Sequence, residues 1–361
     1  MEKLKVGVLG ATGAVGQNYI NLLRDHPWLD ISFLAASKNS DTFQEAVSER
    51  GWFMPQDIPE HARNISVWEA SDVDKAKSLC DFVFSALESD PAKNLELLYA
   101  QEGIPVVSNA SAYRWDSFVP MLIPEINADH IAVIPRQKEV KGYEGFIVVK
   151  PNCSLQSYMT PLYALMQKDF TIDKVVVTTL QASSGAGWPG VPSLDLIDNI
   201  VPYIPKEEDK SEQEPYKILG TVGENGIENY SGLSISATCT RVPVREGHTA
   251  SVNISFSNKK PSRQEIIEIW NSFRGLPQEY KLPSAPEQPI IYREEDNRPQ
   301  PILDRDADKG MAVTVGKLRE CPVFDYKFVA LSHNTIRGAA GGGILNAELL
   351  VKDGYLQNRL K

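Results

Sequence analysis

Short apolar runs alternate with helical patterns over the first third of the chain. Four runs have the continuous character of buried strands and cover residues 5–9, 31–36, 81–85 and 105–108. Residues 15–24 and 91–101 have helical patterns. Continuous apolar strands joined by helices are typical of a parallel sheet covered on both faces. The pattern predicts an α/β domain of the nucleotide-binding type.

The pattern changes after about residue 153. Residues 250–256 alternate strictly between apolar and polar side chains, which indicates a strand with one buried face. Further elements are predicted as strands at residues 174–181, 311–318 and 326–332, and as helices at residues 155–167 and 262–273. We interpret this part as antiparallel strands with helices on one face, an α+β domain. A last helix, residues 338–352, ends near Gly354 and is expected to return to the first domain.

Length and composition agree with two packed domains of ordinary globular character. The chain has 361 residues, of which 42% are hydrophobic and 23% charged. Its formal net charge of -10 disfavours binding to nucleic acid, although a local basic pocket for a small anion remains open. No run approaches the roughly 18 apolar residues of a membrane span, and the first residues lack the pattern of a signal peptide. We therefore expect a cytoplasmic protein.

A glycine-rich turn follows the first predicted strand directly and opens the first predicted helix. It reads Gly10-Ala11-Thr12-Gly13-Ala14-Val15-Gly16. Glycines let the backbone approach a pyrophosphate, and a helix N-terminus offers free N–H groups and a positive dipole end. The alternative is a strand–helix turn without a ligand. Its place at the start of a βα unit favours a dinucleotide site.

The end of the second predicted strand indicates which dinucleotide binds. A site for NAD usually has an acidic residue there, which holds the ribose 2′-hydroxyl. Here Ser37 and Lys38 follow the strand, and the first acidic residue is Asp41. A hydroxyl and a cation suit a 2′-phosphate, so the segment favours NADP over NAD. The alternative interpretation is a solvated loop.

Cys153 is the candidate nucleophile. It lies in Lys150-Pro151-Asn152-Cys153-Ser154, between a predicted strand and a predicted helix, where the helix dipole would stabilise a thiolate. The alternative for any lone cysteine is a small buried residue. The four cysteines lie more than 70 residues apart, which excludes local zinc spacings and a disulfide framework. We therefore expect no metal site, and we interpret the other three cysteines as structural.

Two downstream segments carry further chemistry. Gln181 precedes a flexible serine–glycine loop that includes Ser184 and Gly185, and Arg241 and His248 flank a short turn. A guanidinium can bind a carboxylate with two hydrogen bonds, and an imidazole can move protons near neutral pH. Each residue alone could equally be a surface ion pair or a turn residue. The other histidines have no such neighbours and are interpreted as structural: His26, His61, His130 and His333.

Taken together, these segments resemble the aspartate-semialdehyde dehydrogenases of the archaeal and fungal branch, over nearly the whole chain. The motifs that carry the resemblance are Gly10–Gly16, Ser108–Ala110 with Arg114, Asn152–Ser154, Ser183–Gly187, Leu194–Tyr203, Glu207–Lys210, Arg241 to His248 and His333–Gly341. The resemblance implies a fold like that of glyceraldehyde-3-phosphate dehydrogenase. Residues 1–152 would form a Rossmann-type NADP-binding domain joined by residues 338–361, and residues 153–337 a catalytic and dimerisation domain.

The resemblance also implies a role for each candidate residue. Cys153 would form an acyl-thioester, with His248 as general acid/base and Gln181 orienting the intermediate. The implied substrate residues are Arg241 for the carboxylate, Arg114 and Lys210 for phosphate, Glu207 positioning the lysine, and Asn152. The implied cofactor residues are Gly10, Thr12, Gly13, Ala14, Val15, Ser37, Lys38, Ser184, Gly185 and Asn334. The segment after Ser37 lacks the serine pair followed by arginine that is common in the family.

The implied activity is NADPH-dependent reduction of L-4-aspartyl phosphate to L-aspartate 4-semialdehyde, in the biosynthesis of lysine, threonine, methionine and isoleucine. The implied partners are the small substrate, phosphate and further copies of the chain, as a dimer or tetramer. A malonyl-CoA or succinyl-CoA reductase on the same scaffold is the alternative enzyme. A non-catalytic NADP-binding redox sensor is the alternative from another class, but it would have no need to keep both Cys153 and His248.

Overall fold

Six parallel strands form the first sheet, in the order β3-β2-β1-β4-β5-β6. Their bounds in the computed structural model, which describes residues 2–360, are β1 (Leu4–Leu9), β2 (Leu29–Ala36), β3 (Val67–Glu69), β4 (Phe82–Ser85), β5 (Val106–Ser108) and β6 (Ile147–Val149). This is the order of a doubly wound dinucleotide-binding sheet. The α/β prediction for this part is confirmed.

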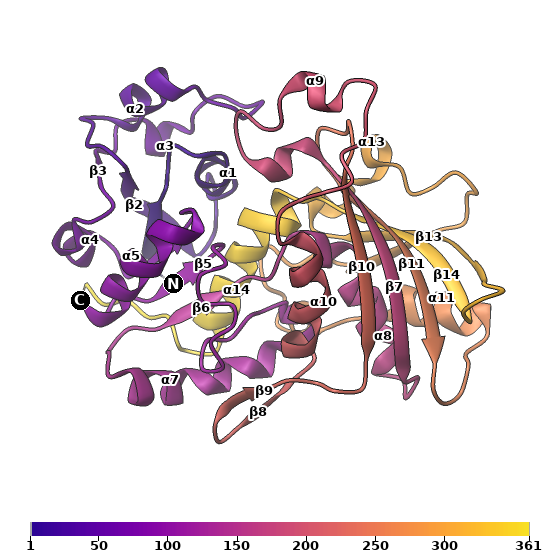
Figure 1. The fold of residues 1–361 in the computed structure, drawn as a ribbon. Helices are drawn as coiled ribbons and strands as arrows, with labels where there is room; N and C mark the ends of the chain where they lie inside the picture. The colour runs from indigo at the N-terminus through magenta and orange to yellow at the C-terminus, as the bar shows by residue number, and fades with distance from the viewer. Residues whose placement is uncertain (1, 361) are drawn as a thin grey trace.

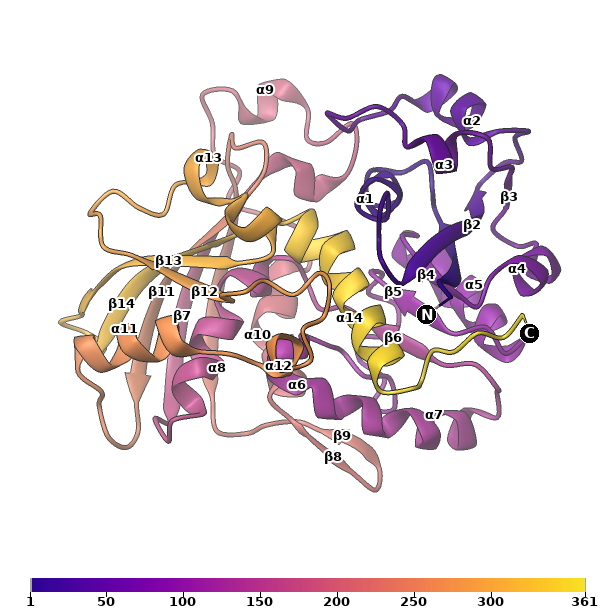
Figure 2. The same cartoon turned by 180° about the vertical axis from the view of Figure 1, so that it is seen from behind.

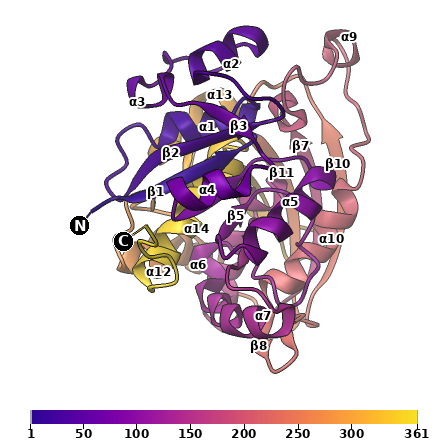
Figure 3. The ribbon, with the colours of Figure 1, turned by 90° about the vertical axis from the view of Figure 1, so that its left-hand side faces the viewer.

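Helices cover both faces of this sheet (Figure 3). They are α1 (Ala14–Leu22), α2 (Phe43–Arg50), α3 (Glu60–Arg63), α4 (Val73–Leu79), α5 (Ser89–Gln101), α6 (Pro124–Asn127), the 3-10 turn Ala128–Val133 and α7 (Ile134–Lys141). On one face, Val6 and Val8 pack with Ile20 of α1. On the other face, Phe33 and Val83 pack with residues of α4 and α5. Burial on both faces explains why the strands are continuously apolar.

The second sheet has the order β10-β7-β11-β14-β13-β12 (Figures 1 and 2). Its strands are β7 (Ile172–Gln181), β10 (Ser234–Arg241), β11 (His248–Phe256), β12 (Ile290–Arg293), β13 (Val313–Glu320) and β14 (Tyr326–Ser332), and a separate hairpin holds β8 (Thr221–Gly223) and β9 (Gly226–Glu228). The prediction of an antiparallel sheet is only partly right, because β10 pairs with β7, and β12 with β13, in parallel. The chain between β7 and β10 contains α9 (Ser193–Leu196) and α10 (Glu207–Ile218), and this length allows a crossover connection.

Helices α8 (Met159–Met166) and α11 (Arg263–Ser272) lie on the face of the second sheet that is turned towards the viewer in Figure 2. Ser262 and Glu265 form the capping box that opens α11. Trp270 of α11 is fully buried and packs edge-on against Phe328 of β14, with 5.1 Å between ring centroids. The remaining short helices are α12 (Leu276–Glu279) and α13 (Pro301–Asp304), with 3-10 turns at Ser183–Ala186 and Ala307–Gly310.

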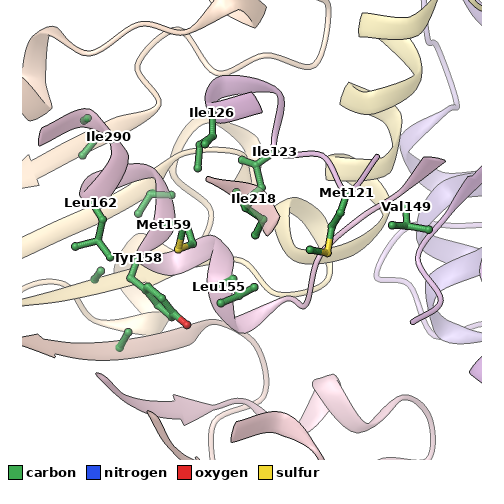
Figure 4. Close-up of a cluster of buried hydrophobic side chains, with 14 of the residues drawn as sticks. Met121, Ile123, Ile126, Val149, Leu155, Tyr158, Met159, Leu162, Ile218 and Ile290 are labelled. Atoms are coloured by element: carbon green, nitrogen blue, oxygen red, sulfur yellow. The ribbon is translucent and has the colours of Figure 1, made fainter. Parts of the chain in front are cut away.

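The segment after Cys153 is two elements rather than the single predicted helix. A 3-10 turn covers Ser154–Ser157, and α8 begins at Met159. Pro161 explains the break, because proline is tolerated in the first turn of a helix but not in its interior. Leu155 and Met159 are fully buried in a cluster that reaches Met121 in the first half of the chain (Figure 4). This cluster anchors the segment that follows Cys153.

The C-terminal helix lies between the two sheets (Figure 2). A π-helical turn, Ile336–Ala340, leads into α14 (Gly341–Lys352), and the helix ends before Gly354, which has φ +80°. Glycines permit close packing here: a Cβ on Gly343 would lie 1.9 Å from the Tyr19 hydroxyl, and one on Gly338 would lie 2.9 Å from Cys153 Cβ. The helix therefore contacts α1, and the turn that leads into it contacts the segment of Cys153.

Candidate active site

Cys153 and His248 form a hydrogen-bonded pair where the two halves of the chain meet. Cys153 follows β6, His248 is the first residue of β11, and Sγ lies 3.3 Å from Nε2. The backbone N–H of Ala182 donates to Nδ1 of His248 at 3.0 Å. An Nδ1 that accepts carries no proton, so the neutral imidazole holds its proton on Nε2. His248 therefore donates towards the sulfur.

Burial keeps both members of the pair neutral in the free protein. It lowers the pKa of His248 to about 3, and the positive charges of Arg241 and His333 act in the same direction. Burial also raises the pKa of Cys153 to about 11, with a further increase from Glu207. The expected stabilisation of the thiolate by a helix dipole is wrong, because the following 3-10 turn has only four residues and desolvation dominates.

Cations oppose this effect on Cys153. Lys150, Arg114 and Arg241 each favour the thiolate and lower the pKa of the thiol. Lys150 is itself fully buried, which lowers its pKa to about 7, and its Nζ donates to the carbonyl of Pro151 at 3.3 Å. A charged ligand that changes the solvation of these cations would therefore change the reactivity of the sulfur.

A cavity of about 460 Å³ adjoins Cys153 and is lined from both halves of the chain. Most of the predicted site residues border it, namely Ala14, Val15, Arg114, Asn152, Cys153, Gln181, Ser184, Gly185, Glu207, Lys210, Arg241 and Asn334. His248 is fully buried behind the cavity. The structure thus brings the candidate nucleophile, three cations and the start of α1 to one space.

Arg241 is held at the end of β10, beside the end of β7. It pairs across the sheet with Gln181, and its Nη1 donates to the carbonyl of Ala182 at 2.7 Å. A Cβ on Gly185 would lie 2.8 Å from this Nη1, so glycine lets the serine–glycine loop approach the guanidinium. Arg241 can present its remaining N–H groups to a carboxylate in the cavity.

The carboxylate of Glu207 accepts hydrogen bonds from three of the candidate side chains. It accepts from Nζ of Lys210 at 2.8 Å, from Nδ2 of Asn152 at 2.8 Å and from Nε2 of Gln181 at 3.2 Å. The side-chain amide of Asn152 forms all its hydrogen bonds within the protein, because its Oδ1 also accepts from the backbone N–H and the hydroxyl of Ser154. This arrangement makes Asn152 a support for the nucleophile segment, while Lys210 keeps donors for a ligand.

Arg114 reaches the cavity from the loop after β5. Its Nη1 lies 2.8 Å from a carboxylate oxygen of Glu214, and its Nη2 donates to the carbonyl of Asn109 at 3.0 Å. Sequence reasoning missed Glu214. Its spacing of seven residues from Glu207 on the same helix was the available signal, since this places both side chains on one face of α10.

The glycine-rich turn has the geometry that a dinucleotide requires. Gly10 has φ +75°, and a Cβ there would lie 2.8 Å from the carbonyl of Ala86. Helix α1 begins at Ala14 with Gly13 as its N-cap, so the N–H groups of its first turn have no acceptor within the helix. A cavity of about 440 Å³ is lined by Gly10, Thr12, Gly13 and Ser37. The residues present fit a pyrophosphate at this helix end.

Ser37 has a cationic neighbour that the sequence did not reveal. Nη2 of Arg50, the last residue of α2, donates to Ser37 Oγ at 3.2 Å. Arg50 and Ser37 also line an adjoining cavity of about 740 Å³ together with Lys38. The arginine is thus supplied by a helix end thirteen residues away from Ser37 in the sequence. Both cations suit a 2′-phosphate beside Ser37.

Asn334 links the serine–glycine loop to the turn before His248. Its Nδ2 donates to Ser184 Oγ at 2.8 Å, and its Oδ1 accepts from the backbone of Gly247 at 2.8 Å. These contacts fix the loop that borders the cavity. Within residues 2–360, no group of three or more His, Cys, Asp or Glu side chains is arranged to hold a metal ion. None of the helices in that range combines the length and hydropathy needed to cross a membrane.

Two family models match the chain. Residues 5–134 match the model described as "Semialdehyde dehydrogenase, NAD binding domain". Residues 162–337 match "Semialdehyde dehydrogenase, dimerisation domain". The first match covers β2 to β5 and all but one residue of β1, and the second match covers β7 to β14.

Similar proteins cover nearly the full length. The aspartate-semialdehyde dehydrogenase of Archaeoglobus fulgidus is 44% identical over 97% of this chain and 99% of its own length. That of Cryptococcus neoformans is 43% identical over 98% of this chain and 99% of its own length. The crystal structure of the Candida albicans aspartate-semialdehyde dehydrogenase with NADP matches with a TM-score of 0.89 and 40% identity, covering 98% of this chain and 100% of that one.

Proposed function

The chain belongs to the aspartate-semialdehyde dehydrogenase family, and we propose that its site performs that family's reaction through Cys153. The reaction converts L-4-aspartyl phosphate to L-aspartate 4-semialdehyde and phosphate with NADPH, and the reverse direction requires phosphate. One observation carries the proposal. A single cavity holds Cys153, the candidate phosphate and carboxylate cations, and Ala14 and Val15 of the dinucleotide turn.

In the first step the Cys153 thiol releases its proton to solvent and the thiolate Sγ attacks the acyl carbon. The C–O bond to phosphate then breaks, and a thioester remains on the sulfur. Arg114 and Lys210 offset the charge of the departing phosphate from the same cavity. Arg241 binds the substrate carboxylate, and the amide of Gln181 orients the thioester. NADPH supplies the hydride that reduces this thioester.

We assign His248 the role of hydrogen-bond donor to Sγ. Its Nε2 proton stabilises the thiolate before attack and again when the sulfur leaves the aldehyde carbon. To act as a general acid or base, the ring has to take up a proton at Nδ1 or change tautomer. Either change breaks the bond from Ala182 N–H, which is 3.0 Å long in the free protein.

The cofactor site favours NADP. Gly10, Thr12 and Gly13 would hold the pyrophosphate, and Ser37, Lys38 and Arg50 would surround the 2′-phosphate. One contact and one cavity support this assignment: Arg50 donates to Ser37 Oγ at 3.2 Å, and Lys38 lines the cavity that these two residues share. The Ser184–Gly185 loop and Asn334 would border the nicotinamide end, because they line the cavity that contains Cys153.

We further propose that the chain divides at residues 152 and 153, with residues 338–361 rejoining the cofactor domain. It assembles as a homodimer or homotetramer through residues 153–337, and it works in the cytoplasm without nucleic-acid or membrane partners. The dimerisation description of the family model that matches residues 162–337 supports self-assembly.

The decisive experiment follows NADPH formation from L-aspartate 4-semialdehyde with and without phosphate. We expect phosphate-dependent reduction of NADP by the wild type and none by Cys153→Ser. Cys321→Ser is the matched control, because it makes the same exchange at a cysteine that does not line the cavity. Activity with malonyl-CoA or succinyl-CoA, and none with phosphate and the semialdehyde, would overturn the proposal.

A further inference from the structure

We infer that Glu214 is the positioning residue that joins the phosphate subsite to the nucleophile segment; the inference rests on the proposed function. Glu214 is fully buried on α10, and it belongs to neither the glycine turn nor the Cys153–His248 pair. Its two oxygens are used separately. Oε1 lies 2.8 Å from Nη1 of Arg114, and Oε2 accepts the backbone N–H of Asn152 at 2.6 Å.

The two partners of Glu214 come from different parts of the molecule. Arg114 lies in the loop after β5, and Asn152 directly precedes Cys153 after β6. Both residues border the cavity. A single carboxylate on a third element therefore sets the position of the phosphate-binding guanidinium relative to the nucleophile.

Helix α10 presents a row of such contacts on one face. Glu207, Lys210, Glu214 and Lys217 are separated by three, four and three residues, which is the spacing of one helix face. Glu207 and Lys210 face the cavity. Glu214 and Lys217 continue the row towards the loop that carries Arg114.

Lys217 fixes that loop from the same helix. Its buried Nζ donates to the carbonyls of Arg114 at 2.7 Å, Asp116 at 2.6 Å and Val119 at 2.7 Å. All three protons of the ammonium group are thereby used. The loop backbone is held by Lys217, and the guanidinium of Arg114 is oriented by Glu214.

The carboxylate form of Glu214 is essential to this arrangement, because both of its partners donate. A glutamine can accept from only one partner with its carbonyl and turns its own amide donors towards the other. The carboxylate-binding Arg241 is held separately, by the carbonyl of Ala182. Loss of Glu214 is therefore expected to affect phosphate far more than the semialdehyde.

The test is Glu214→Gln in the phosphate-dependent reaction. Leaving one buried donor without a partner predicts a rise of about tenfold or more in KM for phosphate, with KM for the semialdehyde changed by less than about twofold. Asp209→Asn is the matched control, because it makes the same charge change at an exposed position of α10 and is expected to alter neither constant. Lys217→Met should shift the same phosphate constant in the same direction.

Other results would overturn the inference. A lower KM for phosphate in Glu214→Gln would show that Glu214 acts only as a repelling negative charge. If Glu214→Gln raises KM for phosphate and KM for the semialdehyde equally, Glu214 has no selective effect on phosphate. The same conclusion follows if both KM values equal those of Asp209→Asn. If Glu214→Gln does not fold, Glu214→Asp decides by the same criteria, because it keeps the carboxylate but is one methylene too short to reach both donors. A wild type without phosphate-dependent activity would instead refute the proposed function.

Discussion

Because His248 carries its proton on Nε2, we can predict how the alkylation rate of Cys153 depends on pH in the free protein. Burial raises the pKa of the thiol to about 11. At any pH below this value, the thiolate fraction increases about tenfold for each unit by which the pH increases. Alkylation of Cys153 by iodoacetamide should then accelerate continuously up to about pH 9 without a plateau. Peptide mass spectrometry of the alkylated protein would report Cys153 separately from the other cysteines.

The perturbation is His248→Ala, which removes the donor 3.3 Å from Sγ. A hydrogen bond to a charged group contributes about 1.5–3 kcal/mol, or about one to two pKa units. At about pH 9 we therefore expect alkylation of the variant to be about 10- to 100-fold slower, because its thiolate fraction is smaller. His61→Ala is the control, because His61 lies on α3 beside the first sheet. The alkylation rate of Cys153 in this variant should match that of the wild type.

A different profile would refute the assigned tautomer. A thiolate–imidazolium pair would give the wild type a plateau at neutral pH, and His248→Ala would abolish that plateau. In that case Nδ1 would carry a proton in the free protein, and the contact with Ala182 N–H could not exist as a hydrogen bond.

Three further predictions concern the cofactor and the stability of the fold. Arg50→Ala should raise KM for NADP by about 10- to 100-fold and leave that for NAD nearly unchanged, as steady-state kinetics with both cofactors would measure; equal effects would exclude a contact with the 2′-phosphate. Gly343→Ala should lower the free energy of unfolding by about 1–3 kcal/mol in a denaturant titration, because its Cβ would collide with the hydroxyl of Tyr19. Burial raises the pKa of Glu96 to about 7, so the wild type loses stability as pH rises from the ordinary value of about 4.5 to about 7. Glu96→Gln should therefore raise Tm at about pH 8 and give no gain near pH 4, and the opposite trend would show that the carboxyl is ionised when buried.

The sequence predicted most helices and strands well, because their formation depends mainly on residues that are close together in the chain. Continuous apolar runs mark β1, β2, β4 and β5, since both faces of that sheet are covered. The direction of β10 and β12 could not be read in the same way, because alternation of buried positions is identical in parallel and antiparallel strands. The break before α8 was readable, since Pro161 cannot lie inside a helix that starts at residue 155.

The candidate site was predictable wherever a residue lies in a contiguous motif. Cys153, Arg241 and His248 were found in this way, and the structure brings them to one place. Arg50 and Glu214 were missed because their partners are distant in the sequence and only the fold brings them together. The protonation of Cys153 was mispredicted for the same reason, because desolvation depends on the whole surrounding structure.

The position of α14 has a consequence for synthesis of the chain. Its buried residues include Ile344, Leu345 and Leu349, which pack in the same core as Val6 and Val8 of β1. The ribosome makes residues 4–149 long before residues 341–352. During this time one apolar face of the first sheet is incompletely covered. The contacts of α14 with β5 and α1 join residues far apart in the sequence, and such contacts form slowly. The nascent cofactor half therefore has to be protected from aggregation until the last helix emerges.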